Sequence, residues 1–480
     1  MKSVSILWVL AAGGLMLAGC RGIPVQGEKQ ARHDLRTVAG QYRPGHQHPA
    51  LPELTPDSGL SNFLAYALLN SPSVEATFYD WSASVENITL TRSLPDPQLT
   101  FQAYIQDTIT SLMPGFAWSF PGPGKLKARA GVAAAQSRGK YFAFESTVLQ
   151  AAFSLKKAYY QLGLLDEQVR LKCETLSLLE NQENAVRAQN VAGSAALPHL
   201  LRVQSERDRV RTELAGLEDS HRSLLENFKA ALGLAPGQAY PPTPAHIEMS
   251  RENPDADELL RVAFARNPQL QAMEADVRAA EAGIKVAYKE RVPDFSAALM
   301  ADVKASPVLY WPQLSMSLPI WRDKIAAEVA GARTEELAAT SRLKAAQIDL
   351  AVNFAEKSFA YRETRRNLAL IEDELIPRAR QSLEIVRAGY RAGTMDFSSL
   401  TDAERTLLEL QLAAAETRTD REIALADLSL LTAGVPPAGA PLLPNNLLDP
   451  PGSSPAMRDK SAPSYRNESQ SRLTSAAAKN

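Results

Sequence analysis

The stretch GTMDF, residues 393–397, interrupts a helical region that extends from about residue 324 to residue 431. A glycine adopts the positive φ that ends one helix and lets the chain enter the next. Gly193, which lies 200 residues earlier and is followed by Ser194, interrupts a similar helical region from about residue 125 to residue 232. The sequence therefore predicts two long helical hairpins, each with a glycine at its tip.

Other landmarks recur at almost the same spacing. SFP at residues 119–121 returns as SLP 198 residues later, and PD at residues 95–96 also returns 198 residues later. A register that is kept over a whole unit indicates a tandem duplication. We place the two copies at residues 60–233 and 256–434, with a proline-rich linker of residues 234–255 between them.

Each copy contains a pair of short runs, at about residues 98–121 and 294–319, in which apolar and polar residues alternate. An alternation with a period of two residues predicts strands that have one apolar face. Strands of about ten residues are long enough to cross an outer membrane when tilted. A half-buried hairpin of a soluble protein gives the same alternation. The apolar positions are Leu99, Phe101, Ala103, Ile105, Phe116, Trp118 and Phe120, then Phe295, Ala297, Leu299, Ala301, Val303, Tyr310, Leu314, Met316 and Leu318.

Four strands are too few to close a barrel, for which about eight are needed. Backbone groups cannot stay unpaired in lipid, so strands cross a membrane only in a closed barrel. If these strands enter a membrane, several chains must share one barrel. Three chains would supply twelve strands and six helical hairpins, which is enough for a tube.

The composition narrows the possible functions. The chain has 480 residues and a net charge of −2, so no basic surface suggests a nucleic-acid partner. Its six histidines are scattered, and no catalytic grouping or phosphate-binding loop is present. We therefore expect no enzyme, no cofactor and no metal site, with His46 and His48 solvated. Of the two cysteines, Cys173 is expected to be a small buried residue in a coiled-coil seam.

The N-terminus has the features of a signal peptide over residues 1–19, namely Lys2 followed by a short apolar run. LAGC at residues 17–20 resembles the bacterial lipobox, which implies cleavage before Cys20 and a lipid anchor on that cysteine. The alternative is an ordinary signal peptide with an incidental cysteine. Residues 20–58 are expected to be a loosely packed lipid-anchored arm, and the Pro/Ser-rich residues 435–480 to be disordered.

The order and spacing of these features resemble the TolC-like outer-membrane efflux family, in its lipoprotein branch. The resemblance covers residues 60–434 and is carried by the duplicated unit, by FPGPGK at 120–125, and by AGYRAGT at 388–394 followed by DA at 402–403. It implies a mainly helical chain with a small β part. Its four strands would contribute to a trimeric 12-stranded β-barrel in the outer membrane, and its helical hairpins to an α-barrel across the periplasm.

The function that the resemblance implies is a passive conduit from periplasm to exterior, the outer-membrane component of a tripartite efflux system. Its implied partners are a periplasmic adaptor protein and an inner-membrane pump of the resistance-nodulation-division type, which open the channel. The alternative is a structural or adaptor coiled-coil lipoprotein of the cell envelope without a pore. Metal ions, drugs and polypeptides all remain open as cargo.

Two kinds of site follow from the resemblance. The hairpin tips are the expected adaptor-docking surface, although their glycines could serve only to make the turns; the residues are Gly193, Ser194, Gly393, Thr394, Met395 and Asp396. Asp402 occupies the position at which the family has an aspartate lining the periplasmic aperture, and Arg202 lies 200 residues earlier. We hypothesise that these two pair across neighbouring hairpins to hold the aperture shut, an interaction worth at most about 1 kcal/mol near water. The alternative is two solvated charges.

Overall fold

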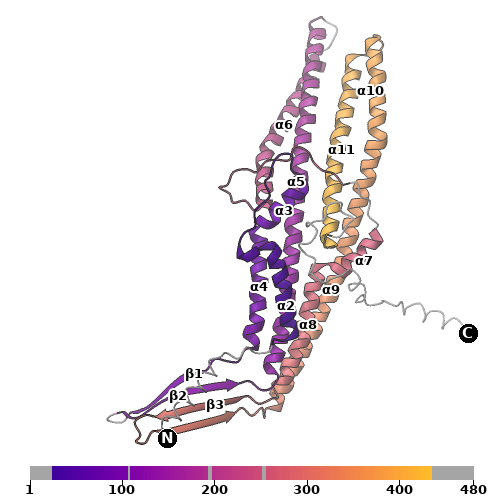
Figure 1. Ribbon diagram of the computed structural model, residues 1–480. Helices are drawn as coiled ribbons and strands as arrows, with labels where there is room; N and C mark the ends of the chain where they lie inside the picture. The colour runs from indigo at the N-terminus through magenta and orange to yellow at the C-terminus, as the bar shows by residue number, and fades with distance from the viewer. Residues whose placement is uncertain (1–23, 106–108, 193–196, 251–255, 435–480) are drawn as a thin grey trace, which may run out of the picture.

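The computed structural model describes residues 24–105, 109–192, 197–250 and 256–434. The chain forms a long helical rod, and a four-stranded sheet projects from one end of it (Figure 1). Both helical hairpins point away from the sheet and end together at the far end of the rod (Figure 1). No helix within these ranges has the length and apolarity that crossing a membrane requires.

The two repeats contain the same elements in the same order: two short helices, two strands, a long helix and a returning helix. The first repeat consists of α3 (Leu60–Asn70), α4 (Pro72–Arg92), β1 (Gln98–Ile105), β2 (Ile109–Phe120), α5 (Lys125–Val191) and α6 (Leu197–Ala231). The second consists of α7 (Ala256–Arg266), α8 (Pro268–Lys289), β3 (Phe295–Asp302), β4 (Leu309–Met316), α9 (Arg322–Ala369), η2 (Leu370–Leu375), α10 (Ile376–Arg391) and α11 (Phe397–Leu431).

A single capping residue separates the two short helices of each repeat. The side chain of Ser71 accepts a hydrogen bond from the backbone N–H three residues later, and Pro72 is the first residue of α4. Asn267 and Pro268 do the same at the start of α8. A polar N-cap followed by proline ends one helix and starts the next. The repeated sequence signal therefore produces the same bend twice.

The long helix of the first repeat is α-helical throughout, whereas that of the second repeat contains a π-helical turn. α5 has 67 residues and extends about 100 Å without a break. The predicted helix from about residue 324 to the second tip is helical throughout, but the π-helical turn η2 interrupts its α-helical hydrogen bonding between α9 and α10. Pro377 follows this turn. Proline has no N–H to donate and its ring crowds the carbonyl four residues earlier, so the wider turn relieves the clash.

The sheet is antiparallel throughout, with strand order β1-β2-β3-β4. Leu99 pairs with Phe116, Phe116 with Leu299, and Leu299 with Pro312. Residues in register share a face, so the predicted apolar positions of all four strands line up on one face, here called the apolar face. The pairing becomes irregular after Tyr104, which limits the alternation of β1 to the residues before Ile105.

The opposite face, here called the polar face, carries mainly polar or small side chains. Its large apolar or aromatic exceptions are Tyr104, Met113, Met300, Leu309 and Trp311. Its polar members are Gln98, Thr100, Gln102, Ser119, Ser296, Gln313 and Ser315.

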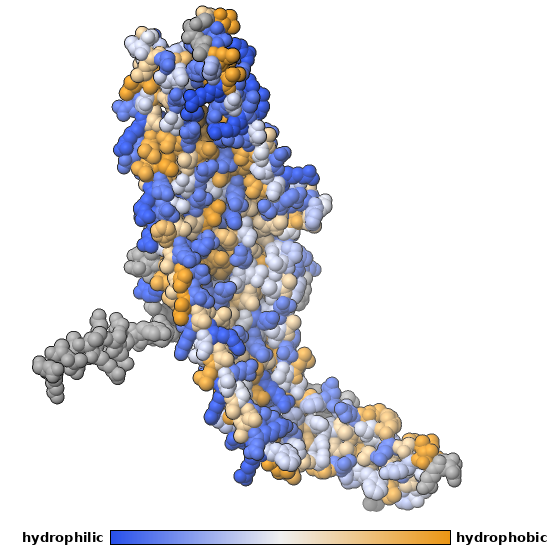
Figure 2. Space-filling view, turned by 180° about the vertical axis from the view of Figure 1, so that it is seen from behind, coloured by the Kyte–Doolittle hydropathy of each residue, from blue (hydrophilic) through white to orange (hydrophobic). Residues whose placement is uncertain are grey.

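The main core of the rod lies in the first repeat, where α3, α4 and α5 meet. The indole of Trp81 stacks on the ring of Phe144 with the centroids 5.9 Å apart. The core of the second repeat, between α7, α9 and α11, is smaller, and its aromatic members are Phe354 and Tyr361. Hydrophobic and hydrophilic side chains alternate in patches along the outside of the rod (Figure 2).

The expectation of a loosely packed arm is wrong over residues 26–42. These residues form helix α2 (Gln26–Tyr42), which lies against α4 and α5 (Figure 1). Tyr42 is buried against Phe78 and Phe144. The carboxylate of Glu28 is also buried, where it accepts hydrogen bonds from Arg92 of α4 and from two further side chains of α2 and α4. Apolar and charged contacts together fix α2 on the rod.

Cys173 also departs from its prediction, because it is exposed on the surface of α5. Leu155 and Leu162 of α5 are buried, whereas Val169 and Leu176, the next positions at the same spacing of seven residues, are only half-buried. The seam therefore ends before it reaches Cys173.

Candidate functional site

The apolar face of the sheet exposes large hydrophobic side chains. Phe101 and Tyr310 are each 69% exposed, and Leu314 is 83% exposed. Exposed apolar patches of this kind mark contacts with a membrane or with another protein. Because the alternation is kept across all four strands, the surface is continuous rather than a set of single exposed residues.

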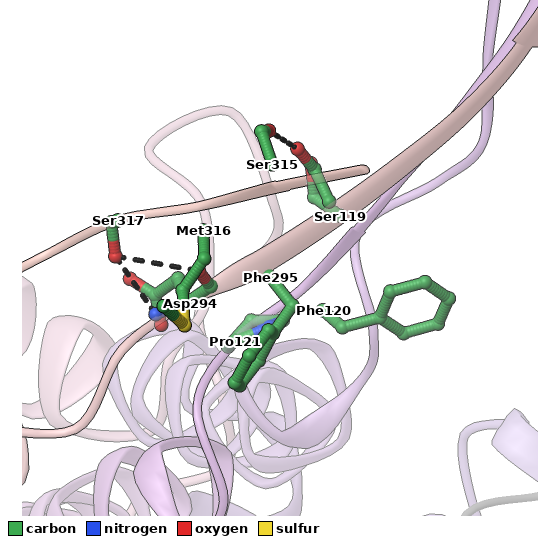
Figure 3. A pocket seen from close by; sticks show the side chains of 9 residues that line it. Ser119, Phe120, Pro121, Asp294, Phe295, Ser315, Met316 and Ser317 are labelled. Atoms are coloured by element: carbon green, nitrogen blue, oxygen red, sulfur yellow. Dashed lines mark hydrogen bonds between the residues drawn. The ribbon is translucent and has the colours of Figure 1, made fainter. Parts of the chain in front are cut away.

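Residues of both faces line a cavity of about 490 Å³ where the strands meet the helices. The hydroxyl groups of Ser296 and Ser315 are 2.5 Å apart, linking β3 to β4. Figure 3 shows Ser119 and Ser315 together on one side of the strands, with the rings of Phe120 and Phe295 on the other. The two faces thus keep different chemistry up to the last residues of the strands.

A buried lysine joins the two repeats beneath this cavity. Lys125 is the first residue of α5, and its ammonium lies 2.9 Å from Glu290 and 3.0 Å from Asp294. The backbone N–H of Gly122 donates to the other oxygen of Asp294 at 2.7 Å. A side chain at Gly122 would come within 2.5 Å of the Pro293 carbonyl oxygen, so only glycine allows this close approach.

Burial alone would lower the pKa of Lys125, but its hydrogen bonds to the two carboxylates outweigh the burial and raise it. Burial likewise opposes ionisation of Glu290 and Asp294. The hydrogen bonds that they accept nevertheless hold the pKa of each carboxyl below its ordinary value. The junction is therefore a charged cluster at neutral pH. Sequence reasoning missed it, although Lys125 and Asp294 both lie in stretches that the repeats had already singled out.

The second hairpin tip is a compact turn. Gly393 has φ of 73°, and the N–H of Thr394 donates to the carbonyl of Gly389 at 2.9 Å. Asp396 caps α11 by accepting a hydrogen bond from the Ser399 N–H at 2.9 Å. A further bond from the Ser399 hydroxyl, together with this one, lowers the pKa of Asp396. Met395 is 41% exposed beside the turn.

The remaining predicted docking and anchoring residues lie outside the described part of the chain. These are Gly193 and Ser194 of the first tip, and Cys20. The signal peptide and the tail of residues 435–480 are outside it as well. The docking role of the tips and the lipid anchor therefore stay predictions.

The structure does not bring Asp402 and Arg202 together within one chain. The carboxylate of Asp402 lies on the same helix as Arg405, whose guanidinium is 3.9 Å away. Arg202 lies on α6 and is exposed. Their pairing across neighbouring hairpins stays a prediction.

A buried carboxylate near the first tip was also missed from the sequence. Glu183 of α5 is 4% exposed and accepts a hydrogen bond from Gln204 of α6 at 2.9 Å, together with bonds from Arg187 and Arg207. These contacts tie the two helices of the first hairpin to each other close to the tip. The i, i+4 spacing of Glu183 and Arg187 on α5 is a local signal, but Gln204 and Arg207 lie on α6 and no spacing in the sequence indicates their contacts.

Comparison with known proteins matches the same regions. The family model described as outer membrane efflux protein matches residues 64–234 and 259–434. The chain is 21% identical over 258 residues to the cobalt-zinc-cadmium resistance protein CzcC of Cupriavidus metallidurans, covering 53% of this chain and 61% of that protein. It is 25% identical over 271 residues to the pyoverdine export outer membrane protein OpmQ of Pseudomonas putida, covering 54% and 56%. The matched segments span less than two thirds of either relative.

The fold is also found among solved structures. The open state of the MtrE outer membrane channel of Neisseria gonorrhoeae superposes with a TM-score of 0.66 at 16% identity, covering 81% of this chain and 94% of that one. This similarity establishes the fold, in which long helical hairpins carry strands that contribute to a β-barrel. The family model matches more than half of the residues, in two segments that correspond to the two repeats. The chain therefore belongs to the outer membrane efflux protein family.

Proposed function

We propose that this chain is the outer-membrane channel component of a tripartite efflux system. Three copies would supply twelve strands to one transmembrane β-barrel and six helical hairpins to a periplasmic α-barrel. The observation that carries the proposal is the open sheet, which has a continuous apolar face and whose outer strands β1 and β4 each have one edge without a strand partner among the described residues. A sheet of this kind is stable in lipid only as part of a closed barrel.

Two features support an outer-membrane location with a lipid anchor. Cys20 ends a lipobox-like stretch, so its sulfur would carry the lipid, and several acyl chains anchor a protein durably. Helix α2 begins six residues later and is packed on α4 and α5. A short segment between the lipid and a firmly held helix would keep the rod close to the membrane.

The hairpin tips are the proposed docking surface for a periplasmic adaptor, which in turn binds an inner-membrane pump of the resistance-nodulation-division type. Gly393, Thr394, Met395 and Asp396 form a compact, exposed turn that another helical tip could approach closely. Gly193 and Ser194 would form the corresponding turn of the first hairpin. Asp402 and Arg202 would face each other from neighbouring chains and favour the closed aperture.

The two curated relatives are named for different cargoes, metal ions in one case and pyoverdine in the other. Their names therefore do not select a cargo for this chain. Strains that lack the gene, tested for sensitivity to metals and to organic toxins, would identify the class.

Planar-bilayer recording of the purified full-length protein tests the channel. We expect a heat-modifiable trimer in detergent that gives stepwise conductance. A water-soluble single chain, or a trimer that never conducts in any state, would overturn the channel and favour a structural or adaptor lipoprotein. Introducing a glutamate at Leu314, on the apolar face, should abolish insertion, whereas the same change at Ser315, on the polar face, should not.

A further inference from the structure

Three exposed cations lie at the corner where the rod meets the sheet. Lys289 is the last residue of α8, Arg291 follows it on the way to β3, and Arg333 lies in the first part of α9. None of the three forms an ion pair within the ranges that the structure describes. Figure 2 shows hydrophilic side chains gathered where the rod meets the sheet. These three residues are here called the basic corner.

An aromatic ring holds the two arginines of the basic corner. The guanidinium carbons of Arg291 and Arg333 lie 5.2 Å and 5.8 Å from the ring centroid of Tyr288. Arg333 also donates a hydrogen bond to the Tyr288 hydroxyl. A cation over an aromatic face is attracted by the negative charge of that face. Two positive charges are therefore held around one ring, in spite of their mutual repulsion.

The carboxylate next to the basic corner already has cations of its own. Glu290 follows Lys289 in the chain, but its two oxygens are bound by Lys125 and Arg129. The side chain of Lys289 instead lies over the turn at Gly124, where a Cβ atom would be 3.1 Å from the lysine nitrogen. The charged cluster at the junction of the repeats therefore leaves the charge of Lys289 uncompensated.

The surroundings of the strands are positive although the whole chain is not. The nine residues next to each strand on the rod side are 89–97, 121–129, 286–294 and 317–325. Together they contain eight Lys or Arg and four Asp or Glu, which gives a net charge of +4. The whole chain has a net charge of −2. Positive charge is therefore concentrated where the sheet joins the rod.

The apolar face of the sheet ends close to the basic corner. Phe295, the first residue of β3, follows Arg291 by four residues. Between β4 and α9, Leu318, Ile320 and Trp321 are 62%, 66% and 72% exposed. Tryptophan is enriched at membrane–water interfaces, and basic side chains beside a membrane attract anionic lipids. If the apolar face contacts lipid, the basic corner therefore lies at the level of the headgroups.

We propose that the basic corner binds the phosphate of an anionic phospholipid in the leaflet that faces the periplasm. This rests on the proposed channel and specifies the lipid at the base of its barrel. Arginine matches phosphate oxygens with two parallel N–H donors, and Lys289 adds a point charge. A zwitterionic headgroup carries its own ammonium or choline cation, so the positive corner favours a headgroup without one.

The exposure of the basic corner favours a lipid over a soluble phosphate. Solvent and salt screen the attraction between an exposed cation and a free anion. A lipid is instead kept beside the strands by its acyl chains, which contact the apolar face while the phosphate contacts the cations. The same charges are therefore more effective toward an anion that is already held at the membrane surface.

Lipid binding to the purified full-length trimer in detergent tests the proposal. Native mass spectrometry measures the affinity for phosphatidylglycerol and for phosphatidylcholine with identical acyl chains. The variant Lys289→Gln/Arg291→Gln/Arg333→Gln removes three charges and retains polar side chains. We expect phosphatidylglycerol to bind the natural protein at least tenfold more tightly than phosphatidylcholine. Each cation near an anionic surface is worth about a fivefold change in affinity, so the variant should lose most of this preference.

The matched control is Arg342→Gln/Lys344→Gln/Arg366→Gln, which removes three exposed cations farther along α9. It should keep the preference for phosphatidylglycerol. A preference that survives in the first variant, or that falls equally in the control, would overturn the proposal. Inorganic phosphate that displaces the lipid at equal concentration would overturn it as well, in favour of a soluble anion.

Folding and channel formation are measured separately in the same samples. If the triple variant does not form a trimer, Arg291→Gln alone, which lies outside α8, should weaken phosphatidylglycerol binding about fivefold; no change would overturn the proposal. A natural trimer that conducts but binds both lipids equally would overturn the lipid site and leave the channel standing. A natural protein that is not trimeric would overturn the proposed function itself.

Discussion

The two repeats share one order of elements but differ in how completely each fills its own core. In the first repeat, α2 adds Tyr42 to a large aromatic core formed with α3, α4 and α5. The second repeat has no counterpart of α2 among its described residues, and its core is small. Its long helix instead leaves Ile348 and Phe359 exposed on a second side. The first repeat thus fills its own core, whereas the second leaves apolar side chains exposed that the proposed trimer would cover.

The largest expected effect comes from the core of the first repeat. Trp81→Ala removes a buried indole that stacks on Phe144, and such changes cost about 3–5 kcal/mol. We expect a large fall in the denaturant midpoint of the dissociated chain, followed by circular dichroism. The contrasting variant Phe359→Ala should leave that midpoint almost unchanged and weaken the trimer instead. If Phe359→Ala destabilises the single chain as much as Trp81→Ala, the contrast between the repeats is wrong.

The junction between the repeats should show the next largest effect. Lys125→Met removes the cation of Asp294 and leaves Glu290 with Arg129 alone, 3.3 Å away, and we expect a loss of about 1–3 kcal/mol at neutral pH. Lys127→Met, an exposed change on the same turn, is the matched control. A loss as small as that of the control would mean that the cluster does not hold the repeats together.

The junction also predicts a pH dependence. The pKa values of Glu290 and Asp294 are lowered in the folded chain, relative to ordinary values of 4.5 and 3.8. Their contribution is therefore complete above about pH 4.5 and is lost as the pH falls through the lowered folded values. Stability curves should show this acid loss in the natural protein, and Lys125→Met should flatten it. An unchanged slope in the variant would assign the acid loss to other carboxylates.

The sequence predicted the elements whose signals are local and repeated. The alternation of the strands and the turn at Gly393 both follow from short-range rules. It failed where two distant segments decide the outcome. Glu28 is buried only because Arg92 lies on another helix, and the charged segment that contains it was therefore expected to be loose. The π-helical turn η2 inside the long helix of the second repeat was also missed, although Pro377 is a local signal for it.

The hairpin tip should respond less strongly. Asp396→Ala removes the cap of α11 and should cost about 1 kcal/mol, while Asp396→Asn should retain most of the cap. Hydrogen exchange of the first turn of α11 measures the local loss. If docking depends on the shape of this turn, adaptor binding should weaken in the alanine variant and survive in the asparagine variant. Equal binding by both would show that the cap is not part of the docking surface.

The smallest expected effect lies at the proposed aperture, where the repeats place opposite charges at equivalent positions. Because exposed ion pairs are worth about 1 kcal/mol or less, Asp402→Ala and Arg202→Ala should each raise the open fraction only a few fold in planar bilayers. If the two side chains act as a pair, the double variant should open no more than either single variant. Arg405→Ala is the control for a contact within the chain, because Arg405 is the neighbour of Asp402 on the same helix. Additive effects of Asp402→Ala and Arg202→Ala would show two independent solvated charges and remove the aperture pair from the mechanism.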